Sequence, residues 1–337
     1  MTPDELQEVD VYQWGDCAVD FVGADLLTGN GFSLRLSPNF SYKSLFTEFL
    51  KQCNSTESSQ FQAFDTTNFE EIQYKLLSTK NVNSIYDIEC PQIPPAVSKL
   101  RDGLIATIQA NHPSASETND SAITALSQSL DTFSNIYTLN YDLYMYRIIM
   151  ASLDRHKVNP SIRPYQDYFW DKWGSKYMAH QDYQSYDKYK HVYYVHGALF
   201  LFPAHVVGHK ADVKVRRSVN TELIDIIGQQ IKDGILPLFV SEGDSAKKHS
   251  TINRSPYLNF AYSQLKKCCN RLVIYGTSLD PQFDQHIIDA LSREKRNIAV
   301  SIYVGSKTLV QIKAETHTIK ARLSNHEVVV FDSSGLF

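Results

Sequence analysis

Short apolar runs alternate with amphipathic stretches along most of the chain. Several stretches have the three- and four-residue spacing of helices, at 143–153, 221–231 and 257–267. Strands that alternate with such helices predict a parallel sheet covered on both faces, so we expect a doubly wound, mostly parallel α/β fold. The runs apolar enough for buried strands, most of them followed by Gly, Asn or Asp, are 24–28, 135–139, 192–195, 237–240, 271–275, 297–304 and 327–331.

The segment between the first two expected strands has a different pattern. Its apolar residues recur at helical spacing, and almost nothing in it reads as a strand. We therefore expect a helical insertion subdomain at 41–133 within a domain made of 1–40 and 134–337. The residues that define its apolar stripes are Phe46, Phe49, Leu50, Cys53, Val97, Leu100, Leu104, Ile108, Ile123, Leu126, Leu130 and Phe133.

Composition and charge exclude several classes of protein. The 337 residues carry a formal charge of −4, so no global basic field attracts nucleic acid or anionic lipid. The first residues are acidic, and no apolar run approaches the roughly 20 residues that span a bilayer, which predicts a cytoplasmic protein without membrane contact. The five cysteines form no C-x-x-C pair, so neither a disulfide framework nor a tetrathiolate zinc site is indicated.

The first expected strand leads into a glycine-containing loop, Gly29-Asn30-Gly31-Phe32-Ser33. Two glycines after a buried strand allow backbone N–H groups to approach a pyrophosphate, because side chains there would block it. The third glycine of the dinucleotide fingerprint is missing, and no helix is expected directly afterwards. An ordinary turn between a strand and a loop is the alternative for this segment.

The second expected strand ends in Thr138-Leu139-Asn140-Tyr141-Asp142, directly before an amphipathic helix. Ligands of open α/β sheets gather at the carboxyl ends of strands. The Asn140 amide can hold a water or a ribose hydroxyl. Asp142 can either accept hydrogen bonds from a sugar or cap a helix that begins at Leu143.

The third expected strand delivers His196, followed at once by Gly197. A histidine in this place can act as a general base near neutral pH, and the glycine leaves room for a substrate beside it. Eleven histidines are present, so a packing or surface role for His196 is the alternative.

A later strand ends in Gly276-Thr277-Ser278, a small turn rich in hydroxyl groups that can contact phosphate or ribose. Asp280 and Asp284 follow. These carboxylates either join the ligand site or cap the expected helix at 286–291. Metal binding would need further oxygen ligands, which the sequence does not supply, so no metal is expected.

Together, the four loops resemble those of the sirtuin NAD-binding domain. The first two are similar to its Gly-Ala-Gly-x-Ser and Thr-x-Asn-x-Asp motifs, and Val195-His196-Gly197 and Gly276-Thr277-Ser278-Leu279 match the other two. The motifs occur in order from Gly29 to Leu279, so the resemblance covers most of the chain and implies a Rossmann-like, sirtuin-like fold.

The resemblance is closer to divergent bacterial sirtuin-like proteins than to protein deacylases. No paired cysteines for the deacylase zinc ribbon follow His196-Gly197. The loop after Ser33 reads Leu34-Arg35-Leu36-Ser37-Pro38-Asn39-Phe40 where the deacylases have Gly-Ile-Pro-Asp-Phe-Arg.

The resemblance also implies roles for particular residues. The loop from Gly29 to Ser33 would cradle the pyrophosphate of NAD, Asn140 would position water at the nicotinamide ribose, and His196 would accept a proton. Asp142 and Ser278 would hold ribose hydroxyls. The remaining residues expected to bind NAD are Thr138, Gly276, Thr277 and Asp280.

The expected activity is that of an NAD glycohydrolase, which releases nicotinamide and ADP-ribose as an abortive-infection effector against phage. The resemblance implies activation within a complex, as a homo-oligomer or with a HerA-like hexameric ATPase through which any contact with nucleic acid would be indirect. The alternatives are a regulatory subunit that binds NAD or ADP-ribose without chemistry, and a protein deacylase or ADP-ribosyltransferase.

Overall fold

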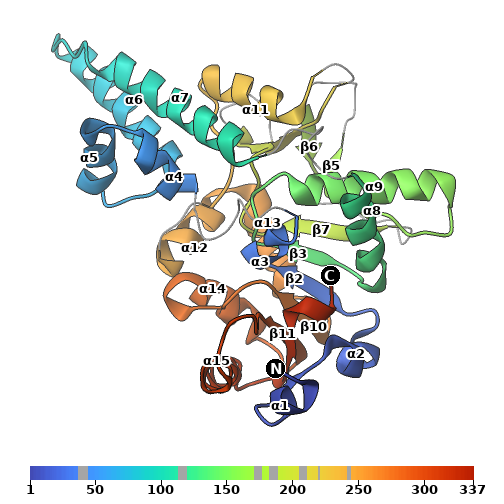
Figure 1. Cartoon of the computed structure of the whole chain (residues 1–337). Helices are drawn as coiled ribbons and strands as arrows, with labels where there is room; N and C mark the ends of the chain where they lie inside the picture. Colours follow the sequence, from blue (N-terminus) through green and yellow to red (C-terminus); the bar gives the residue numbers. More distant parts are fainter. Residues whose placement is uncertain are drawn as a thin grey trace.

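An eight-stranded sheet whose pairings are all parallel forms the centre of the molecule, with helices around it (Figure 1). The computed structural model describes residues 1–36, 45–112, 120–170, 177–181, 189–204, 211–218, 221–240 and 244–337. In spatial order the strands are β1 (Val11–Tyr12), β12 (Glu327–Asp332), β11 (Asn297–Ile302), β10 (Arg271–Tyr275), β2 (Asp25–Thr28), β3 (Ile136–Thr138), β7 (Lys190–Tyr194) and β4 (Tyr165–Gln166).

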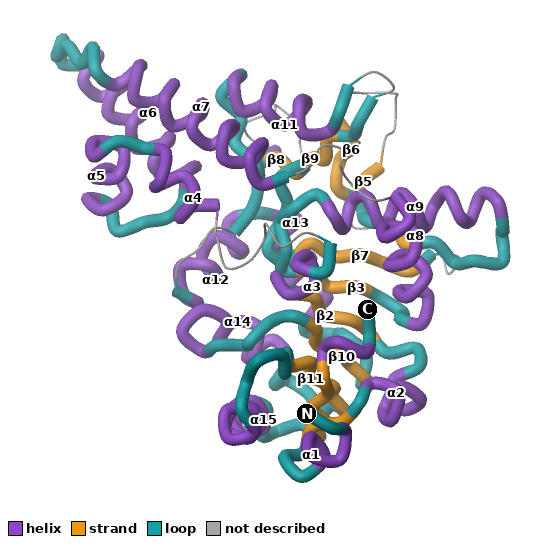
Figure 2. The backbone as a smooth tube through the Cα atoms, viewed as in Figure 1, coloured by secondary structure: helices purple, strands orange, loops and turns teal. Residues whose placement is uncertain are grey.

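The strand order reverses at β2. The chain continues from β2 to β3 and β7 on one side of it, and later places β10, β11 and β12 on the other side (Figure 2). This arrangement confirms the expected doubly wound, mostly parallel α/β fold. In such sheets a ligand site lies outside the carboxyl ends of the strands, at the point where the order reverses.

Four strands end at the same level around this point. Residue by residue, Tyr275 of β10 pairs with Thr28 of β2, Thr28 pairs with Thr138 of β3, and Thr138 pairs with Tyr194 of β7. Neighbouring strands are about 4.8 Å apart, so this row spans roughly 14 Å. The four polar loops singled out in the sequence therefore leave the sheet from one row.

The described residues between β2 and β3 form helices and the turns that join them, and no strand. The helices are α3 (Asn30–Leu34), α4 (Leu45–Gln52), α5 (Ser55–Ala63), α6 (Phe69–Ile85), α7 (Ile93–Asn111) and α8 (Asp120–Ser129), with a 3-10 turn at Leu130–Thr132. Phe46, Phe49, Phe61 and Phe69 pack ring against ring and join α4, α5 and α6. The α6–α7 hairpin extends away from the sheet at the upper left of Figure 1.

The remaining helices connect or precede the strands of the sheet. No helix in the described part of the chain is long and apolar enough to cross a membrane. These helices are α1 (Pro3–Gln7), α2 (Trp14–Cys17), α9 (Tyr144–Val158), α11 (Leu223–Lys232), α12 (Ser245–Arg254), α13 (Pro256–Leu265), α14 (Pro281–Leu291) and α15 (Leu309–Arg322).

The expected strand at 237–240 is wrong. This segment forms one isolated bridge, between Phe239 and Gly197, and its other backbone bonds go to the bent segment 196–201. Gly197 has a φ of +73°, which turns the chain and prevents a regular ladder. The sequence analysis also missed a small antiparallel sheet in the order β5 (Phe169–Trp170), β6 (Tyr177–His180), β9 (Val213–Val215) and β8 (Leu201–Phe202).

The turns after β2 and β10 touch through their backbones. The Gly31 N–H donates to the Gly276 carbonyl oxygen at 2.8 Å, and the Gly29 N–H donates to the Tyr275 carbonyl oxygen at 2.9 Å. A Cβ at Gly31 would lie 2.6 Å from Gly276 Cα, and one at Gly276, whose φ is +75°, would lie 2.6 Å from the Phe32 nitrogen. The glycines therefore bring two strand ends together, a role the sequence analysis did not assign to them.

We predict that Gly276→Ala lowers the free energy of unfolding by about 2 kcal/mol or more, because the methyl group meets backbone atoms at a left-handed residue. Urea denaturation measures this change. Gly15→Ala in α2 is the matched control, since no atom lies within 4 Å of the added Cβ. Equal stability of the two variants would contradict the prediction.

Candidate active site

Ser33, Asn140 and Asp142 form one buried chain of hydrogen bonds. Ser33 lies on α3, directly beyond the end of β2, whereas Asn140 and Asp142 follow β3. Asn140 Nδ2 donates to Ser33 Oγ at 2.7 Å, and the Ser33 hydroxyl donates to Asp142 Oδ2. The Tyr144 N–H donates to the other oxygen of Asp142 at 2.8 Å. Two loops expected to form one site are thus joined by their side chains.

This chain determines how the Asn140 amide is oriented. A hydroxyl has one proton, and the Ser33 proton goes to Asp142, so Ser33 can only accept from Asn140. The nitrogen of the amide therefore faces Ser33. The carbonyl oxygen, Asn140 Oδ1, faces the other way, and no residue in the described part of the chain donates to it. An acceptor in this position can hold a water molecule.

Asp142 is a buried carboxyl group that accepts hydrogen bonds from Ser33, after β2, and from Tyr144, after β3. Burial raises its pKa, and the hydrogen bonds from Ser33 and from the Tyr144 N–H act in the opposite direction. The helix that follows begins at Tyr144, one residue later than expected, and Asp142 supports its first turn. Of the two roles expected for Asp142, the support of the helix is therefore seen, and the binding of a sugar stays a prediction.

His196 lies directly beyond β7 and is buried against a second histidine that was not among the expected site residues. His196 Nε2 is 2.9 Å from His286 Nε2, and His286 Nδ1 is 2.8 Å from Ser245 Oγ. Burial, His286 and Lys248 together lower the pKa of His196 well below its usual value, and burial with Lys248 and His249 lowers the pKa of His286 to about 3. Both rings are therefore neutral at pH 7.

Register places Asn140 beside His196. Thr138 and Tyr194 are paired at the ends of adjacent strands, and each of the two site residues stands two positions beyond the end of its strand. Their backbones are joined on both sides of this point, since the Val195 N–H donates to Thr138 and the Leu199 N–H donates to Tyr141. The backbones of Asn140 and His196 thus follow neighbouring strand ends, and the joint action of their side chains stays a prediction.

The other residues in and next to the first loop differ in how exposed they are. Asn30 is exposed at the start of α3, a helix that the sequence analysis did not expect after the first strand. The Phe32 ring is buried in the core against Tyr275 and Phe337, so it is unavailable to a ligand. The Thr28 hydroxyl, in the middle of the row of strand ends, is buried and has no partner among the described residues.

Gly276 and Thr277 lie against the loop that follows β2. Ser278 and Asp280 lie near Arg322, the last residue of α15. A Cβ at Gly29 would lie 2.6 Å from Thr277 Cβ, so that turn covers the first loop closely. The exposed Ser278 accepts a bond from Arg322 through its carbonyl oxygen. Asp280 caps α14 by accepting from the Gln282 N–H at 2.9 Å, which is why this helix begins at Pro281, before the expected range.

A half-buried ion pair lies beside the two histidines. Lys248 Nζ on α12 is 3.3 Å from Asp284 Oδ1 on α14. Burial raises the pKa of Asp284, and Lys248 opposes that shift. The described residues contain no cluster of three or more His, Cys, Asp or Glu side chains suited to a metal ion.

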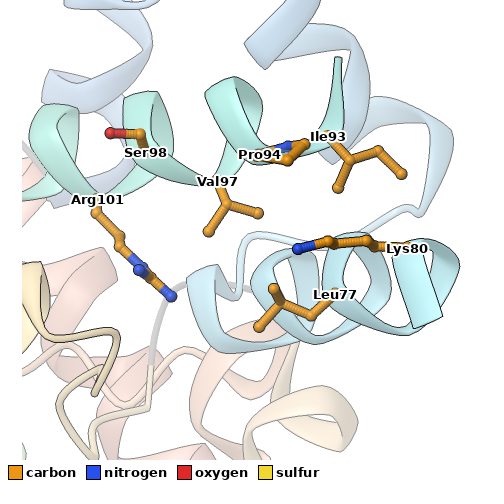
Figure 3. Close-up of a pocket in the computed structure, with 7 residues that line it drawn as sticks. All are labelled: Leu77, Lys80, Ile93, Pro94, Val97, Ser98 and Arg101. Atoms are coloured by element: carbon orange, nitrogen blue, oxygen red, sulfur yellow. The ribbon is translucent and has the colours of Figure 1, made fainter. Parts of the chain in front are cut away.

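A surface pocket lies elsewhere, on the α6–α7 hairpin (Figure 3). Its volume is about 210 Å³, below the roughly 300 Å³ of the smallest usual ligand sites. One of its two cations, Arg101, already donates to Gln73 at 2.7 Å. We therefore do not assign this pocket to the candidate site. Its lining residues are Leu77, Lys80, Ile93, Pro94, Val97, Ser98 and Arg101.

Comparison with known proteins adds two findings. A family model described as "Domain of unknown function (DUF4917)" matches residues 26–335. A solved structure described as "Structural Basis for the Mechanism and Regulation of Sir2 Enzymes" aligns with 95% of this chain and 100% of its own, at 11% identity and a TM-score of 0.38. No curated protein sequence matches.

We predict that Ser33→Ala lowers the free energy of unfolding by about 1–3 kcal/mol, because the buried Asp142 carboxylate loses a donor. The loss raises the pKa of folded Asp142 further above its unfolded value. An acid with a raised folded pKa destabilises the fold increasingly as pH rises, so the loss is larger near about pH 8 than near about pH 5.

Urea denaturation at both pH values measures this difference, with the exposed Ser129→Ala as the matched control. A loss that is independent of pH would show that Ser33 does not act on the Asp142 carboxylate.

Proposed function

This chain belongs to the DUF4917 family, and we propose that it is an NAD glycohydrolase that cleaves NAD to nicotinamide and ADP-ribose. The observation that carries the proposal is the fixed Asn140 amide, whose oxygen has no donor among the described residues and whose backbone follows the strand next to the one that leads to His196. This arrangement suits a reaction in which water must be held at one anomeric carbon.

The row of strand ends has dimensions and groups that suit a dinucleotide. It spans roughly 14 Å at the place where α/β sheets bind such ligands. The loop from Gly29 to Ser33 is proposed to lie along the pyrophosphate, as the resemblance implies, with Thr277 beside it; the N–H groups of Gly29 and Gly31 already donate to Tyr275 and Gly276. The buried, unpartnered Thr28 hydroxyl supports a polar occupant, because buried polar groups normally have a partner.

The proposed chemistry balances with water as the only co-substrate. The bond between the ribose and the nicotinamide nitrogen breaks, and the electron pair leaves with nicotinamide, which becomes neutral. A water oxygen held by Asn140 Oδ1 bonds to the anomeric carbon, and its proton passes to His196. Such cleavage proceeds through an oxocarbenium-like state, in which the positioned water and ribose lower the barrier. No metal enters the proposed reaction.

The cellular part of the proposal rests on the resemblance of the four loops. We propose that NAD loss aborts phage infection and that a complex activates the enzyme, either a homo-oligomer or an assembly with a HerA-like ATPase. Cleavage of a metabolite that every cell needs requires such control.

One observation favours a second function, a subunit that binds NAD or ADP-ribose without chemistry. His196 already has a hydrogen-bond partner, and burial makes it a weak base. Tight binding of NAD without release of nicotinamide under activating conditions would select this function. A modified partner protein, found by mass spectrometry, would select a deacylase or ADP-ribosyltransferase.

We predict that Asn140→Ala reduces the rate of nicotinamide release about 100-fold or more, because water loses the acceptor that positions it. His196→Ala is expected to reduce it about 100-fold, the usual lower range for loss of a general base. Chromatography of nicotinamide, with purified protein alone and with its partner, measures both rates.

Ser98→Ala, in the pocket on the α6–α7 hairpin, is the matched control and should retain the wild-type rate. Unchanged cleavage in Asn140→Ala would reject the assigned site.

A further inference from the structure

A chain of three buried groups leads from α12 to the candidate site. Ser245 Oγ on α12 lies 2.8 Å from His286 Nδ1 on α14, and His286 Nε2 lies 2.9 Å from His196 Nε2. The three side chains are at most 9% exposed. The Tyr262 hydroxyl also donates to the carbonyl oxygen of His286, which holds this residue in place.

The direction of each hydrogen bond in this chain follows from the number of protons. The backbone N–H of His286 is a fixed donor and points at Ser245 Oγ, at 2.7 Å. Within the described residues, His286 Nδ1 is the one acceptor within reach of the Ser245 hydroxyl proton. A buried hydroxyl rarely leaves its proton unpartnered, so Ser245 donates to His286 Nδ1.

The positions of the remaining protons in this series of hydrogen bonds are then fixed. A neutral imidazole carries one proton, so His286, which accepts at Nδ1, carries its proton on Nε2. That proton is donated to His196 Nε2. His196 accepts there and must carry its own proton on Nδ1. The bond between the two rings cannot be a contact of two charged rings, because burial and Lys248 disfavour the charged form of both.

We infer that Ser245 and His286 are positioning residues that hold the proton of His196 on Nδ1, so that the resting site offers a ligand a donor from His196 and not a lone pair. His196 Nε2 is occupied by His286, which leaves Nδ1 as the ring nitrogen without a partner among the described residues. The tautomers of both rings can be measured without any substrate.

The functional consequence rests on the function proposed above. His196 can accept a proton at Nδ1 only in its other tautomer, with the proton on Nε2 donated to His286. His286 must then carry its proton on Nδ1, and the Ser245 hydroxyl must turn away from it. The bond from Ser245 therefore restrains base catalysis, and an event that releases this bond at the start of α12 would activate the site.

The first test measures the tautomers directly. The full-length chain, labelled with 15N-histidine, is studied near neutral pH by long-range proton–nitrogen correlation, and the resonances are assigned with His196→Gln and His286→Gln. We expect the proton on Nδ1 in His196 and on Nε2 in His286. The proton on Nε2 in wild-type His196 would overturn the inference.

The second test removes the proposed restraint. Ser245→Ala should show both tautomers of His196, whereas Ser245→Thr, which keeps the hydroxyl, should match the wild type. Nicotinamide release by Ser245→Ala should rise about five- to tenfold, the effect of one hydrogen bond on an equilibrium. A rate equal to or below that of the wild type, with mixed tautomers, would refute the restraint.

The two proposals fail separately. Wild-type tautomers as expected, with no nicotinamide release by any variant under activating conditions, would reject the glycohydrolase and leave the tautomer assignment intact. Nicotinamide release that depends on Asn140, with His196 protonated on Nε2, would do the reverse.

Discussion

The single proton of the Ser33 hydroxyl is the constraint on which the candidate site depends. Because Asp142 takes that proton, Ser33 must accept from Asn140, and the amide oxygen of Asn140 must face away. This geometry needs α3 and the end of β3 to be close together. The contacts of Gly29 and Gly31 with the turn at Gly276 hold α3 there, since any side chain at those glycines would separate the two loops.

Burial determines the charge state of the histidines in the candidate site. The charged forms of His196 and His286 are both disfavoured because the rings are removed from water. Neutral groups in such surroundings interact mainly through hydrogen bonds. In a series of linked hydrogen bonds, the donor at one end determines which group donates at the other end. Ser33 and Ser245, on different helices, therefore act in similar ways: each hydroxyl proton selects the face that a more distant side chain presents.

The sequence was sufficient to predict the layers of the fold and the four loops, because apolar strands and the polar residues that end them are local patterns. It did not identify His286 and Ser245, which contact each other across 41 residues and reach His196 across 90. Helix α15 was also missed, since few of its residues are buried and its periodicity is weak. The glycines were recognised as points of close approach, but the group that approaches them is another turn of the same chain.

The positive charge beside the histidines limits how well His196 can act as a base. Lys248 disfavours an imidazolium at His196 and at His286, so a proton accepted at His196 cannot stay there at low cost. The burial and positive charge that keep both rings neutral therefore add to the restraint that the bond from Ser245 places on His196 as a base.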